Sequence, residues 1–219
     1  SRRFAIVEAI FPPSTMASRK MCPTGTIFTF ERDASSSQNS YAGTMKRSSL
    51  PLTVSFEEKR WEEIRSTYRR FRAGTLDRPI VPFKVRGKDP WRPEPETPPL
   101  TQATAIQLSS NPEKLIDRLD WDLSRFTCLT DSFPYVNMDA FGPGVLAAFL
   151  GAEVDDSTGR IWFHAPREQE LPQMHFEYDP DHALLRRIKD IYALGAEHWG
   201  SKVLMGMPDL GGVLDILAT

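Results

Sequence analysis

Residues 133–154 read FPYVNMDAFGPGVLAAFLGAEV, and this stretch decides the predicted fold. The apolar run that starts at Phe133 predicts a strand ending near Asp139, and the sequence GPG then predicts a turn. The residues VLAAFLGAEV continue as a short helix that we expect to end at Gly151. A carboxylate at the carboxyl end of a buried strand, before a glycine turn, is where α/β proteins place functional groups.

On both sides of this stretch, predicted helices and strands alternate. Amphipathic helices are expected over residues 55–74, 111–126 and 179–200, with a further helix starting after residue 210, and strands over 80–85, 160–165 and 202–207. The proline-rich residues 89–100 predict no regular element. Several strands are almost entirely apolar, which is typical of a parallel sheet covered by helices.

Sequence signals also predict where the helices begin. Ser55 and Glu58 have the spacing of a capping box, and Asn111 followed by Pro112 is a typical helix start. Asp179 and Pro180 are expected to open the helix over 179–200.

The first 50 residues differ in texture from the rest. They are rich in Ser, Thr, Gly and Pro and show no sustained hydrophobic periodicity. This composition predicts a flexible leader. Met45 resembles a natural protein start, and the residues before it are then a non-native extension. The folded part is expected over residues 51–219.

Composition excludes several function classes. The chain has 27 basic and 29 acidic residues and a net charge of -2, so nothing favours a nucleic-acid partner. Its longest apolar stretch, residues 142–152, is too short to span a bilayer. Cys22 and Cys128 have no disulfide or metal-ligand pattern, which favours a reduced, cytoplasmic protein without a bound metal.

Two local motifs resemble ligand sites. GMPDLGG (206–212) has the glycines of a phosphate loop but lacks the Lys and Ser or Thr that must follow them, so a tight turn is the simpler interpretation. MHFEYDPDH (174–182) contains residue types that ligate zinc, but a solvated polar loop explains it as well.

The strongest candidates lie at strand ends. Asn137 and Asp139 are two residues apart in a predicted strand, so their side chains are expected on the same side. The alternative is that Asp139 only caps the following turn through its own backbone. Arg86 follows another strand, where it could bind a carboxylate or be an ordinary exposed arginine.

In combination, these pieces resemble the N-terminal half of the uroporphyrinogen decarboxylase superfamily, over about residues 56–219. The segment GTLDRPIVPFKVRG is similar to the family's first strand. The family's strand-end Asp and the pattern L-G-x-E-V are matched by Asp139 and by residues 150–154, and KVLMGMPDLGG is similar to its glycine-rich loop.

This resemblance implies a (β/α)8 TIM barrel of which only the N-terminal half is present, because such a barrel needs about 250 residues. It implies decarboxylation of tetrapyrrole acetate side chains with neither metal nor organic cofactor. Asp139 would be catalytic by stabilising positive charge on the substrate ring. The residues expected to bind this small-molecule substrate are Arg86, Asn137, Gly206, Met207 and Asp209.

The chain lacks the M-R-Q-A-G-R motif that decarboxylases carry after the first strand and has FKVRGKDPWR instead. This departure favours an alternative within the superfamily, a zinc-dependent methyltransferase acting on corrinoid proteins, with zinc ligands outside this chain. A third alternative is a non-catalytic half-barrel whose open sheet edge pairs with another chain, a homodimer included.

Overall fold

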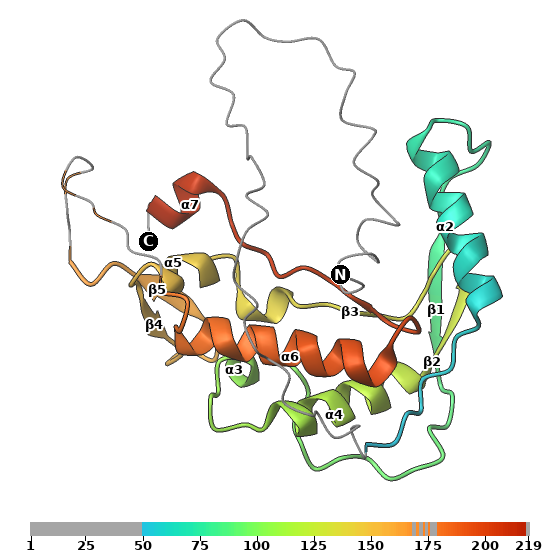
Figure 1. The fold of residues 1–219 in the computed structure, drawn as a ribbon, viewed down its shortest axis with the longest axis horizontal. Coiled ribbons are helices and arrows are strands. Elements are labelled where there is room, and N and C mark those ends of the chain that lie inside the picture. The colour runs from blue at the N-terminus through green and yellow to red at the C-terminus, as the bar shows by residue number, and fades with distance from the viewer. Residues whose placement is uncertain (1–49, 168–169, 171–172, 174, 176–178, 218–219) are drawn as a thin grey trace, which may run out of the picture. The chain divides into compact units, whose positions relative to one another are not determined.

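The computed structural model describes residues 50–167, 170, 173, 175 and 179–217, so the predicted leader lies almost entirely outside the described residues. The chain is a mixture of helices and strands (Figure 1). In chain order the elements are α2 (Glu58–Arg72), β1 (Pro82–Arg86), α3 (Gln102–Ala105), α4 (Pro112–Ser124), β2 (Phe126–Thr130), β3 (Tyr135–Val136), the 3-10 helix η2 (Asp139–Phe141), α5 (Val145–Phe149), β4 (Glu153–Asp155), β5 (Trp162–His164), α6 (Ala183–Trp199), β6 (Leu204–Met205) and α7 (Val213–Leu217).

The strands form two-stranded sheets rather than one continuous sheet. β1 pairs with β2 and β4 pairs with β5, both antiparallel, whereas β3 pairs with β6 in parallel. Within the described residues, the expected parallel arrangement is therefore limited to β3 and β6. The TIM barrel stays a prediction.

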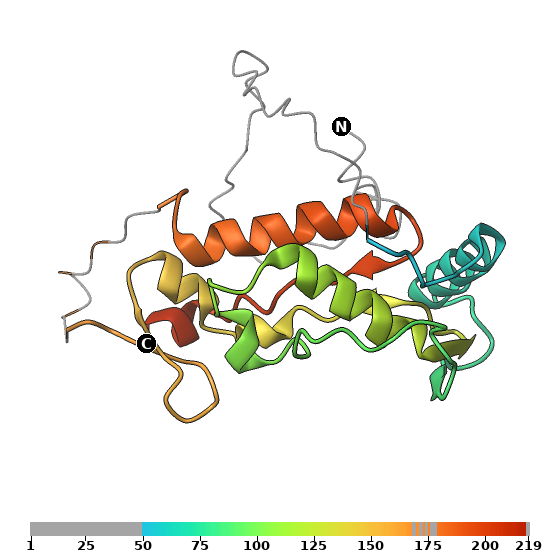
Figure 2. The same ribbon diagram turned by 90° about the horizontal axis from the view of Figure 1, so that it is seen from below.

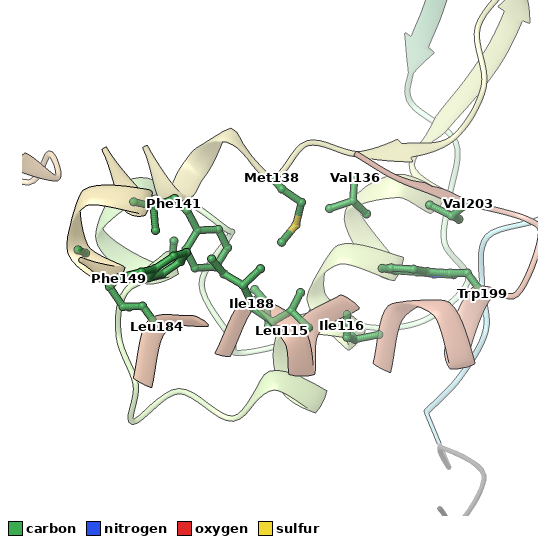
Figure 3. Packing of buried hydrophobic residues seen from close by; sticks show 14 of the residues in the cluster. Leu115, Ile116, Val136, Met138, Phe141, Phe149, Leu184, Ile188, Trp199 and Val203 are labelled. Carbon is green, nitrogen blue, oxygen red and sulfur yellow. The ribbon is translucent and has the colours of Figure 1, made fainter. Parts of the chain in front are cut away.

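The main core lies between the β3–β6 pair and two helices. α4 and α6 lie side by side in both views (Figures 1 and 2). Val136 and Met138, from β3 and the residues after it, point toward Leu115 of α4 and Ile188 of α6 (Figure 3). Each such side chain, taken fully out of water, stabilises the fold by about 1.5–3 kcal/mol. This region therefore supplies most of the buried apolar surface.

α4 begins as predicted and ends earlier than predicted. Asn111 Oδ1 accepts a hydrogen bond from the Glu113 amide at 2.8 Å, and Pro112 is the first helical residue. The helix ends at Ser124 because Phe126 is already in β2, where it pairs with Arg86. Strand β2 was not predicted.

Two predicted helix caps are wrong. α2 begins at Glu58 after Glu57, with no side-chain cap, so Ser55 lies ahead of the helix start. α6 begins at Ala183 after His182. Asp179 Oδ1 instead accepts from the Asp181 amide at 2.8 Å, which closes a local turn before the helix. In both places the polar residue that was predicted to cap the helix lies ahead of the first helical residue.

Asp120 of α4 is a fully buried carboxylate that joins distant segments. It accepts hydrogen bonds from the Thr53 amide at 2.7 Å and from Trp199 Nε1 at 2.9 Å, and His198 Nε2 lies 3.4 Å away. Burial raises the pKa of Asp120, but the contacts with His198, Trp199 and Thr53 outweigh burial and lower it overall. The group is thus a polar centre inside the helical region.

The β1–β2 ribbon, with α2 beside it, forms a second region. The amphipathic helix expected over residues 55–74, with Trp61, Ile64, Tyr68 and Phe71 on its apolar face, is confirmed only in part. Trp61 is buried and packs on Phe133, with ring centroids 5.1 Å apart, but Phe71 is 53% exposed. Asp131, after β2, accepts two hydrogen bonds from Arg78 at 2.6 and 2.8 Å and one from the Val81 amide at 2.9 Å. These bonds fix the end of the ribbon.

None of the helices in the described ranges has both the length and the apolar composition needed to cross a bilayer.

Candidate functional site

The parallel pairing of β3 and β6 brings the carboxyl ends of two strands together. Tyr135 pairs with Leu204 and Val136 with Met205, and the Gly206 amide donates to the Val136 carbonyl at 2.9 Å. Asn137 and Gly206 therefore follow neighbouring strands at one edge. We call Asn137, Asp139, Tyr192 and Gly206 the β3–β6 edge.

Gly206 is a glycine because the backbone of β3 comes very close. A Cβ at this position would lie 2.8 Å from the Val136 carbonyl oxygen, which is backbone and cannot rotate away. The Gly206 carbonyl in turn accepts a short hydrogen bond from the Tyr192 hydroxyl of α6. The loop after β6 is thus attached to both β3 and α6.

Asp139 does not lie in a strand. β3 ends at Val136, and the Asn137 Oδ1 accepts from the Asp139 amide at 2.8 Å, so the chain turns into η2. The prediction that Asn137 and Asp139 point to the same side of a strand is wrong, because this Asx turn ends the extended backbone. The Asn137 side chain forms the turn. Asp139 is the first residue of η2, and its carboxylate is exposed to solvent.

The electrostatics of the edge couple Asp139 to Tyr192. Burial, with a further contribution from the negative charge of Asp139, raises the pKa of the Tyr192 hydroxyl to about 12. Tyr192 therefore remains a protonated hydrogen-bond donor at neutral pH. Sequence reasoning did not select Tyr192, because an isolated tyrosine on a helix face reads as part of the core.

Met207 and Asp209 continue from Gly206 into an exposed loop. The side chain of Met207 is 74% exposed. Asp209 Oδ1 accepts from the Gly211 amide at 2.9 Å, and Gly211 has a φ of 69° that favours glycine. This bond makes the tight turn expected for GMPDLGG. The structure brings Asn137 beside Gly206, and Tyr192 connects Gly206 with the charge of Asp139, whereas Asp209 stabilises its own turn.

Arg86 lies on the other sheet. It is the last residue of β1, is exposed, and pairs across the ribbon with Phe126. Its neighbour on the same face, Lys84, pairs with Cys128 and places Nζ 4.2 Å from the centre of the Tyr135 ring. Sequence analysis selected Arg86 and missed Lys84, although both belong to FKVRG.

Lys84 and Tyr135 lie between two cavities. The smaller, of about 210 Å³, is also lined by Leu123, Phe126, Cys128, Pro134 and Asn137. The larger, of about 410 Å³, is also lined by Tyr68, Pro82, Ser132 and Phe133. We call these two cavities the Lys84 pocket. Asn137 belongs both to this pocket and to the β3–β6 edge, so the two are adjacent.

Burial affects the two titratable groups of the smaller cavity. It lowers the pKa of Lys84, with a small opposing effect of Cys128, and it raises the pKa of the Cys128 thiol. Each shift favours the neutral form. The pocket is therefore a partly dehydrated environment with one amine.

In the part of the chain that the structure describes, no group of three His, Cys, Asp or Glu side chains is placed to hold a metal ion. Glu177 of the MHFEYDPDH segment lies outside the described residues. No family model, curated protein or solved structure matches the chain.

Proposed function

We propose that the chain is the N-terminal part of an enzyme of the uroporphyrinogen decarboxylase superfamily, with a TIM barrel as its complete fold. Its activity is that of a carboxy-lyase that removes carbon dioxide from acetate side chains of a tetrapyrrole. One observation supports this most: the segment that carries Asp139 follows β3 and Gly206 follows β6, and these two strands pair in parallel. The resemblance to the superfamily implies that a strand-end Asp and a glycine-rich loop line the same cleft.

Asp139 suits the charge requirement of this reaction. Protonation of an electron-rich pyrrole ring gives a cation, and breaking the bond to the carboxylate returns an electron pair to that ring as carbon dioxide leaves. An exposed carboxylate that is fixed before the reaction stabilises such a cation without rearranging. Asp139 is held at its backbone by Asn137 and lies beside a tyrosine that stays protonated.

The test is anaerobic incubation of the full-length enzyme that contains this chain with uroporphyrinogen, with products oxidised and separated by chromatography. We expect Asp139→Asn to lower turnover by about 10²–10³-fold, as for removal of one preorganised electrostatic group. Asp156→Asn, at an exposed carboxylate in the β4–β5 turn, is the matched control and keeps full turnover. Equal turnover of the two variants contradicts the role of Asp139.

The Lys84 pocket favours a second candidate, methyl transfer to or from a corrinoid protein with zinc. Lys84 is the one cation among the residues that line its two cavities, whereas a substrate with eight carboxylates calls for several. Stoichiometric zinc in the full protein, with methyl transfer and no carbon dioxide release, selects this candidate. Concentration-dependent association with neither activity selects the non-catalytic half-barrel.

A further inference from the structure

We propose that Lys84 binds the carboxylate of a small ligand whose apolar ring occupies the smaller cavity of the Lys84 pocket. The inference rests on the proposed function for placing the ligand beside the β3–β6 edge, but its test needs no turnover. It assigns to Lys84 the carboxylate-binding role that was expected of Arg86.

Lys84 carries a positive charge that no acidic side chain in the described part of the chain neutralises. Among the described residues, no Asp or Glu side chain lies within ion-pair distance of its Nζ, and the facing groups are the Tyr135 ring and Cys128. The exposed lysines and arginines of the chain need no partner because water solvates them. Lys84 is half-buried, so part of this solvation is lost.

A bound anion would reverse the effect of burial on the pKa of Lys84. Burial disfavours the charged amine and lowers the pKa of Lys84. A carboxylate at hydrogen-bond distance favours the charged form, and a charge-assisted hydrogen bond in a partly dehydrated site is stronger than one in water. We therefore expect a larger fraction of Lys84 to be in the protonated, charged form when an anion binds.

The smaller cavity would hold the rest of the ligand. The smaller cavity holds about 210 Å³ and is walled by Leu123, Phe126, Pro134 and the Tyr135 ring. An engineered protein cavity of about 150 Å³ binds benzene, so this volume admits one aromatic ring with a short side chain. Asn137 also lines this cavity and belongs to the β3–β6 edge. A pyrrole with an acetate side chain has this size and chemistry.

The experiment measures protection of Lys84 in the full chain. The protein is acylated with trace acetic anhydride near pH 8, with phenylacetate or with neutral phenylacetamide, and each lysine is quantified by peptide mass spectrometry. We expect saturating phenylacetate to slow labelling of Lys84 by about tenfold, phenylacetamide to have little effect, and exposed Lys88 to be unaffected by both. Unchanged labelling of Lys84 up to the solubility limit of phenylacetate overturns the inference.

Variants test the same point through affinity. Lys84→Met keeps the apolar stem and should weaken phenylacetate binding at least about tenfold by calorimetry, whereas Lys84→Arg restores most of it. Lys88→Met is the matched control and binds normally. Should Lys84→Met fail to fold, the protection experiment on the unaltered chain still decides.

The outcomes separate this inference from the proposed function. Protection of Lys84 without porphyrinogen turnover supports the carboxylate site and contradicts decarboxylation. Turnover with unprotected Lys84 supports decarboxylation and contradicts this site.

Discussion

The helical region around β3 and β6 and the ribbon region of β1, β2 and α2 are stabilised in different ways. In the helical region Ile116, Phe141 and Ile191 are fully buried. On the ribbon, Phe83 is 55% exposed and its cross-strand partner Leu129 is 40% exposed. The first region excludes water from its own core, whereas the ribbon has apolar side chains in water and relies more on polar contacts.

Those polar contacts are concentrated at the end of the ribbon. Asp131 binds Arg78 and the Val81 amide, and the buried Ser132 donates its hydroxyl to the Phe83 carbonyl at 2.6 Å. Hydrogen bonds are directional and hold strands in register, but each contributes only about 0.5–1.5 kcal/mol net. The Lys84 pocket lies against the ribbon region, and Lys84 itself belongs to strand β1.

The largest expected effect comes from emptying the helical core. Phe141→Ala should lower the free energy of unfolding by about 3–5 kcal/mol, because it removes a fully buried ring and leaves a cavity. Phe83→Ala on the ribbon should change it by about 0.5 kcal/mol or less. Urea titrations followed by circular dichroism measure both. Similar losses for the two variants would remove the distinction between the regions.

The next effect tests the β3–β6 edge, where the helical region meets the pocket. Gly206→Ala should cost about 1–3 kcal/mol, because its methyl group meets the Val136 carbonyl oxygen. Tyr192→Phe loses one hydrogen bond to the same loop without a clash and should cost about 0.5–1.5 kcal/mol. The same denaturation experiment ranks them. A Gly206→Ala protein as stable as the parent would mean that the two strands separate freely.

The smallest expected effect is a response to low pH, which should distinguish the ribbon region from the helical region. The Arg78 hydrogen bonds lower the pKa of Asp131 to about 2 from its ordinary 3.8. A lowered pKa means that the ionised form stabilises the fold. Its contribution is full above about pH 4 and is lost as the pH falls through about 2. The hydrogen-exchange protection factor of the Val81 amide should fall over this range.

Asp131→Asn supplies the control for that measurement. Its Val81 amide should be less protected at neutral pH and should change less on acidification, while the Leu115 amide in α4 keeps its parent protection. Equal Val81 profiles in the two proteins would show that Asp131 does not hold the ribbon.

Elements with strong local signals could be predicted from the sequence. α4 has its Asn111 cap and apolar period, and the stretch from Phe133 to Gly151 gives a strand, a turn and a short helix in the correct order. β2 was missed because FTCLT directly follows a helix and continues its apolar pattern. β4 was missed because it is three residues long and forms only by pairing with β5.

The site was predicted less completely, because its residues lie far apart in the sequence and come together only in the fold. Asp139 and Gly206 were selected, and the placement of their segments after neighbouring strands depends on the parallel β3–β6 pair. Lys84 was not selected, because one lysine in a strand carries no signal until Cys128 and Tyr135, both more than forty positions away by their residue numbers, surround it. Local rules also could not foresee that Asn137, rather than Asp139, shapes the turn.

The buried carboxylate of Asp120 has a consequence for the order of folding. Its partners Thr53 and Trp199 lie 67 and 79 residues away in sequence, on opposite sides of it. Contacts of such separation form slowly, because long loops must close before any of them stabilises the chain. We therefore expect Asp120 to stay hydrated through the early steps and to lose its water late, when α4, α6 and the segment around Thr53 assemble. In a kinetic experiment, Asp120→Asn should accelerate unfolding much more than it slows folding.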